Sequence, residues 1–84
     1  MNTKLEKQNY LNRSTDLNNI KSNGFYYVES HHHGIANSPT TKIFSLIVSG
    51  VYFVNQLCLS ENKIYSRHYD ADQKIWHSWR TVQM

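Results

Sequence analysis

The stretch that decides the fold runs from Ile43 to Tyr69 and reads IFSLIVSGVYFVNQLCLSENKIYSRHY. It is rich in the β-branched, aromatic and aliphatic residues that favour pleated strands. Turn-forming residues interrupt it twice, at Ser49-Gly50 and at Ser60-Glu61-Asn62. Short apolar segments between such breaks predict consecutive β-strands joined as an antiparallel meander. The strands expected here are 43–49, 52–59 and 63–69.

The flanking sequence extends the same pattern in both directions. Asn23-Gly24 precedes the aromatic segment 25–28, and the turn 70–73 precedes a closing segment, 75–82. Between 31 and 41, Gly, Asn, Ser and Pro predict a loop, and 14–20 predicts one capped helical turn. The fold class predicted is therefore mainly β, a small antiparallel sheet of four to five short strands with one short helical turn and a polar N-terminal arm.

The alternation within the strands indicates that both faces of the sheet meet something. On the expected strand 52–59, Asn55, Leu57 and Leu59 share one face, whereas Val54, Gln56 and Cys58 share the other. Neither face is purely polar. A chain of 84 residues builds only a modest core, and one cysteine permits no intrachain disulfide. We therefore expect oligomerisation to supplement the core.

Charge and hydropathy exclude several classes of protein. The net charge is +3, with the Lys and Arg residues dispersed along the chain, which indicates a mixed solvated surface. Single-stranded nucleic-acid binding, through aromatic residues interleaved with Lys63, Arg67 and Arg80, is an alternative that this dispersal disfavours. The longest apolar run, 43–48, is far shorter than a membrane helix, so we expect no membrane insertion.

A wider pattern spreads over residues 16–82. Its parts are Asp16-Leu17-Asn18-Asn19-Ile20, Gly24-Phe25-Tyr26-Tyr27-Val28, Asn37-Ser38-Pro39, Ser45-Leu46-Ile47-Val48, Val54-Asn55-Gln56-Leu57, Ile64-Tyr65-Ser66-Arg67 and Trp76-His77-Ser78-Trp79-Arg80. In this order and spacing the chain resembles the knob domains that end bacteriophage head and tail fibres, the pyocin-knob-like family. Only the N-terminal arm lies outside the resemblance.

The resemblance implies a virion structural protein, assembled in the host cytoplasm, whose residues 16–84 form an outward-facing fibre knob. The arm, residues 1–15, would dock on capsid or tail proteins. A homotrimer is expected, as a short head fibre or appendage that binds host surface polysaccharide. A receptor-binding tail-fibre tip and a purely structural decoration without a ligand stay open as alternatives.

The candidate binding residues are aromatic side chains around one arginine. Trp76 and Trp79 could form a platform for sugar rings or could cap the core, and a break between them would be needed to bring them together. Arg67, between Tyr65 and Tyr69 on one strand face, could stack on a ring, pair with an acid or bind an anionic sugar.

Two further sets of residues are candidates for contacts with partners or metal. Leu5, Tyr10 and Leu11 are the large apolar residues of the arm after Met1 and would anchor it or join the trimer. His31 and His33 would point the same way in an extended segment, and three copies could surround an axial metal. The favoured interpretation is a polar loop without metal.

Catalytic motifs are absent from the sequence. It contains no Gly-x-Ser-x-Gly, phosphate-binding glycine loop or His-Glu-x-x-His. Cys58, in an apolar strand, fits a buried small hydrophobe better than a nucleophile. We therefore expect neither enzymatic activity nor a cofactor.

Overall fold

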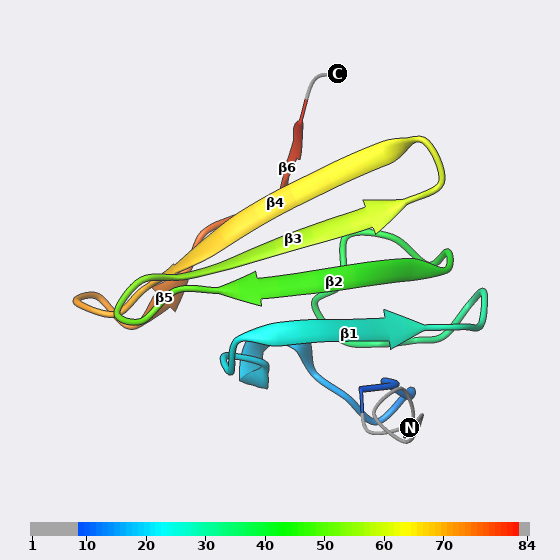
Figure 1. Cartoon of the computed structure of the whole chain (residues 1–84), viewed down its shortest axis with the longest axis horizontal. Helices are drawn as coiled ribbons and strands as arrows, with labels where there is room; N and C mark the ends of the chain where they lie inside the picture. The colour runs from blue at the N-terminus through cyan, green and yellow to red at the C-terminus, as the bar shows by residue number, and fades with distance from the viewer. Residues whose placement is uncertain (1–8, 83–84) are drawn as a thin grey trace, which may run out of the picture.

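The chain folds into one antiparallel sheet, and the predicted fold class is confirmed. A computed structural model describes residues 9–82 (Figure 1). Within that range its elements are the 3₁₀ turn η1 (Leu17–Asn19) and the strands β1 (Gly24–Val28), β2 (Phe44–Ser49), β3 (Val54–Ser60), β4 (Lys63–Asp70), β5 (Ile75–Trp76) and β6 (Arg80–Val82).

The strands β1 to β4 lie side by side in chain order, as a meander (Figure 1). Both β5 and β6 pair with β4, at opposite ends: Trp76 stands opposite Tyr69, and Val82 stands opposite Ile64. The single closing strand expected over 75–82 is therefore two short strands. The break at residues 77–79 redirects the chain, which neither a Gly nor a Pro announces in the sequence.

The hydrophobic core lies on one face of the sheet. The alternation predicted for β3 is confirmed, since Val54, Gln56 and Cys58 are buried. Neighbouring strands contribute the other core side chains on this face, and two residues outside the sheet complete the cluster. Its buried hydrophobic members are Leu17, Val28, Ile35, Phe44, Leu46, Val48, Val54 and Cys58.

Two segments outside the strands cover this core. The predicted capped turn is η1, where the Asp16 carboxylate accepts a hydrogen bond from the Asn18 amide at 2.9 Å. The long loop after β1 runs alongside it, and the Leu17 amide donates to the Ala36 carbonyl at 3.1 Å. Leu17 and Ile35 are thereby pressed against the sheet from two points of the chain.

The described part of the N-terminal arm adds to the free edge of β1. The Leu11 amide donates to the Tyr27 carbonyl at 2.8 Å, and the Tyr27 amide donates to the Asn9 carbonyl at 2.9 Å. A strand edge left bare exposes unpaired amides and carbonyls to other chains. The arm shields part of that edge. Leu5, which was predicted as an anchor, lies outside the described residues.

The loop between β2 and β3 depends on Gly50. Its φ of +131° is a conformation that other residues rarely adopt, and a Cβ there would overlap the Phe53 carbonyl oxygen. The loop presents exposed apolar side chains, with Val51 96% exposed. The hydroxyl of Tyr52 donates a hydrogen bond to Asp72 in the turn between β4 and β5, and this contact raises the pKa of Tyr52.

Candidate functional site

Arg67 is the centre of the most elaborate set of contacts in the described chain. Its guanidinium carbon lies 4.0 Å from the centre of the Trp76 ring and 4.7 Å from the centre of the Trp79 ring. Both indoles therefore bind the cation through their electron-rich faces. We call these three residues the Arg67 stack.

The indole nitrogens fix the two tryptophans to segments far away in the sequence. Trp76 Nε1 donates to the Asn18 carbonyl in η1 at 3.1 Å, and Trp79 Nε1 donates to the Asn37 carbonyl in the long loop at 2.8 Å. Buried indoles normally satisfy their N–H in this way. The break after β5 brings both rings to Arg67, as the sequence analysis required of any joint role.

Gln56 links the stack to the turn beneath it. Its oxygen accepts from Arg67 Nε at 2.9 Å, and its nitrogen donates to the carbonyls of Leu17 and Ile20 at 2.8 and 2.9 Å. Gln56 is fully buried, so each of these bonds replaces water that the side chain lost on folding. The network ties β3 and β4 to η1.

Burial and a nearby carboxylate act in opposite directions on the charge of Arg67. Burial lowers its pKa to about 10, while the Asp16 carboxylate favours the charged form. Asp16 accepts hydrogen bonds from Asn37 Nδ2 and the Asn18 amide, and these hold its own pKa below the usual value. At neutral pH the stack therefore contains a charged guanidinium.

The predicted binding residues divide between this stack and its surroundings. Trp76, Trp79 and Arg67 are brought together, and the Tyr69 ring lies 5.3 Å from the Trp76 ring. Tyr65 packs against the core on the same strand but takes no part in the stack. Arg67 was expected to stack on a ring, pair with an acid or bind an anionic sugar, and the rings on which it stacks are the two tryptophans.

The opposite face of the sheet, which we call the open face, carries an apolar surface that the described residues leave open, apart from the Tyr10 ring on Tyr27. It consists of the side chains that alternate with the core, and not one of them is buried. Two adjacent cross-strand rows contain its apolar members. These apolar rows are Phe25, Tyr27, Ile47, Leu57, Leu59, Ile64 and Val82.

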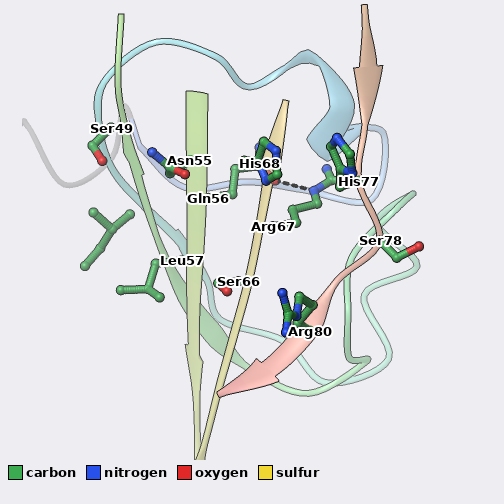
Figure 2. A pocket seen from close by; sticks show the side chains of 11 residues that line it. Ser49, Asn55, Gln56, Leu57, Ser66, Arg67, His68, His77, Ser78 and Arg80 are labelled. Atoms are coloured by element: carbon green, nitrogen blue, oxygen red, sulfur yellow. Dashed lines mark hydrogen bonds between the residues drawn. The ribbon is translucent and has the colours of Figure 1, made fainter. Parts of the chain in front are cut away.

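A pocket with a volume of ≈ 670 Å³ lies at one end of the open face (Figure 2). We call it the open-face pocket. Side chains from β2, β3, β4, β6 and the segment after β5 surround it. Its lining residues are Ile47, Ser49, Asn55, Gln56, Leu57, Ser66, Arg67, His68, His77, Ser78 and Arg80.

The two histidines of the pocket stack on each other. Their ring centres are 4.2 Å apart with an angle of 18° between the planes, and the His77 amide donates to the His68 carbonyl. Sequence reasoning did not select either histidine or Arg80 for the pocket. The alternation within 63–69 placed His68 on the face opposite Arg67, but nothing in the sequence indicated that the chain would fold back to bring His77 onto it.

The side chains of His31 and His33, which were considered as metal ligands, do not come together in one site. His33 is buried against Phe44, with 5.4 Å between the ring centres, and its Nδ1 accepts from the Ile35 amide. His31 is exposed, and its ring neighbour is His32. Between residues 9 and 82, no group of three or more His, Cys, Asp or Glu side chains converges to hold a metal ion.

The predicted arm anchors lie near these histidines. Leu11 packs against the core, and the Tyr10 ring meets the Tyr27 ring edge-on at 5.7 Å.

In the described range the chain forms no helix long and apolar enough to span a bilayer. Comparison of the chain with protein-family models, with curated proteins and with solved structures gave no match.

Proposed function

We propose that the chain is a bacteriophage virion structural protein, a subunit of a short head fibre or appendage that displays this sheet as an outward knob. The observation that carries the proposal is the uncovered open face. The resemblance of residues 16–82 to fibre knobs supplies the virion context. A role in assembly and binding, without catalysis, fits both.

The apolar rows are the surface through which copies of this chain would meet. They hold seven apolar or aromatic side chains, of which Phe25 is 51% exposed, and the charged Arg80 stands at the end of one row, opposite Ser66. Among the described residues, the internal core has eight buried hydrophobic residues. Burying the rows against further copies would add apolar area that the isolated subunit leaves in water. We assign the rows to a homotrimer, the symmetry that the fibre resemblance implies.

The arm, residues 1–15, takes the role of dock to the capsid or tail proteins. Its described part already follows the β1 edge, and Tyr10 and Leu11 bring it close to the sheet. The knob then extends from the site of attachment. Host surface polysaccharide is its proposed ligand, and avidity across three subunits would strengthen weak individual sites. Decoration without a ligand and a tail-fibre tip are the competing roles.

Nucleic acid is a poorer fit to the geometry. Single-strand binding needs aromatic faces free to stack on bases. One face of Trp76 and one face of Trp79 are turned to Arg67, and the Tyr69 ring receives the Lys21 ammonium at 4.1 Å.

Sedimentation velocity at micromolar concentration tests the assembly. We expect a trimer for the native chain and a monomer for Leu59→Lys, which places a charge in the apolar rows. Val51→Lys is the matched control, because Val51 lies in the exposed loop outside the rows. Circular dichroism establishes that each variant is folded. A native chain that stays monomeric contradicts the proposed trimer.

The virion role has its own experiment. The chain carrying a peptide epitope tag should copurify with phage particles through a density gradient, and antibody should label an external appendage in electron micrographs. A chain absent from purified particles overturns the virion assignment, whatever its oligomeric state.

A further inference from the structure

We propose that the open-face pocket binds an anionic saccharide unit, a sugar carrying a carboxylate, phosphate or sulfate group. This inference rests on the proposed function, because it gives the outward knob a ligand class and a place to bind it. It differs from the site expected at the tryptophans, which lies on the other face of the sheet.

The charged side chains in the lining of the pocket are all positive. Arg80 supplies permanent positive charge, and His68 and His77 add imidazole groups that can donate hydrogen bonds. Arg67 also borders the pocket, but its guanidinium lies between the two tryptophans on the core side. Among the described residues, no Asp or Glu lines the pocket. The nearest carboxylate along β4, Asp70, is already engaged, since it accepts from the amides of Asp72 and Gln73. An anion entering the pocket therefore meets the Arg80 cation and no carboxylate from the described part of the chain.

Apart from Gln56 and Arg67, the polar side chains of the pocket make no hydrogen bond to described residues. The structure gives no hydrogen bond or ion pair to the side chains of Ser49, Asn55, Ser66, His68, His77, Ser78 or Arg80. Hydroxyl, amide, imidazole and guanidinium groups can all donate to an oxyanion or a sugar hydroxyl. Binding would not require breaking any internal hydrogen bond made by these side chains.

Size and apolar character favour a sugar over a bare ion. The volume of ≈ 670 Å³ lies in the usual range of small-molecule sites. Ile47 and Leu57 supply apolar surface for the C–H face of a ring. A phosphodiester polymer of nucleotides would also be anionic, but no Phe, Tyr or Trp lines the pocket to stack on its bases.

The pocket and the apolar rows share Ile47 and Leu57. Figure 2 shows Ser49 and Asn55 at one side of the pocket and His77 and Ser78 at the other, with His68 between them. A saccharide bound among these groups would lie at the margin of the subunit contact. The two experiments therefore use residues that belong to one surface alone, Leu59 for subunit assembly and Arg80 and His68 for ligand binding.

The test is an amide NMR titration of the whole chain. The probes are trigalacturonic acid, sialyllactose, mannose 6-phosphate and a sulfated disaccharide at millimolar concentration. Fully methyl-esterified trigalacturonic acid is the uncharged match for the first probe, and inorganic phosphate and a thymidine oligonucleotide complete the set. We expect at least one acidic sugar to shift the amides of Ser66, His68 and Arg80.

Arg80→Gln should weaken that binding about tenfold or more, the effect of losing one charged hydrogen bond. The matched control is Arg13→Gln, an exposed arginine outside the pocket, and it should leave the affinity unchanged. The fold of each variant is checked from its dispersed amide spectrum.

Several results would overturn the inference: no response to any of the four acidic sugars, equal binding of the esterified trisaccharide, or shifts confined to Trp76 and Trp79. Equal affinity for phosphate alone would reduce the pocket to a small-ion site, and stronger binding of the oligonucleotide there would replace the saccharide with nucleic acid. Sedimentation velocity reports the trimer independently, so failure of the ligand and failure of the assembly are distinguishable.

Discussion

Replacing Gln56 with methionine should remove a large part of the stability of the domain. Methionine is close to glutamine in size but cannot make the three hydrogen bonds that Gln56 forms. The Arg67 Nε–H would be left buried without an acceptor, and the Ile20 carbonyl would lose its bond. The Leu17 carbonyl would keep a bond from the Ile20 amide at 3.2 Å.

These losses set the magnitude. A lost bond to a buried charged group costs about 1.5–3 kcal/mol and each bond to a neutral carbonyl about 1 kcal/mol, so Gln56→Met should lower the free energy of unfolding by about 3–5 kcal/mol. A domain of this length has a total of about 4–13 kcal/mol. With a urea slope near 1.5 kcal/mol/M, the midpoint should fall by about 2–3 M.

Urea denaturation followed by tryptophan fluorescence measures this change at fixed protein concentration. The matched control is Gln73→Met in an exposed turn, which should change the free energy by less than about 0.5 kcal/mol. The double variant Gln56→Met/Arg67→Met should lose less than the sum of the two single variants, because the two side chains interact. A cost below about 1 kcal/mol for Gln56→Met would refute the bracing role assigned to the network.

Three further predictions concern the loop between β2 and β3, the loss of stability at acid pH, and the reactivity of the Cys58 thiol. Gly50→Ala should lower the free energy of unfolding by at least about 1–3 kcal/mol, because alanine is strained at this φ and its Cβ meets Phe53; unchanged thermal unfolding would contradict this. Asp16 has a pKa in the fold below its ordinary 3.8, so its contribution is present above that pH and is lost as pH falls through the folded value; acid titration of Asp16→Asn should show a shallower loss than the native chain, and parallel curves would contradict it. Burial raises the pKa of Cys58 to about 12, so a disulfide thiol reagent at pH 8 should modify it only after unfolding; rapid modification of native protein would count against this.

The meander was predictable because its information is local. Alternation within 54–60 and turn residues such as Ser49-Gly50 predict strands and breaks without reference to the rest of the chain. The same alternation placed Gln56 and Leu57 on opposite faces of the sheet, and the structure agrees, but the alternation did not identify which face carries the core. The capped turn around Leu17 was predictable for the same reason, since Asp16 acts on an amide two residues away.

The candidate site depends on contacts between side chains far apart in the sequence, which no local pattern encodes. The sequence suggested a joint role for Trp76 and Trp79 but did not identify Arg67 as the partner that they share. Both rings reach Arg67 because β5 and β6 pair with opposite ends of β4. Likewise the stack of His68 on His77 arises from a cross-strand pairing after the turn. The physical reason is that side-chain partners across a sheet are set by register and chain reversal.

The Arg67 stack also limits how early folding can be completed during translation. Its hydrogen bonds join residues 58 and 42 positions apart, Trp76 to Asn18 and Trp79 to Asn37. A nascent chain therefore presents η1 and the long loop well before the indoles that clamp them have been translated. Until Trp79 leaves the ribosome, the Arg67 guanidinium lacks one of its ring partners. Completion of folding should thus follow translation of β1 to β4 and wait for β5 and the segment after it.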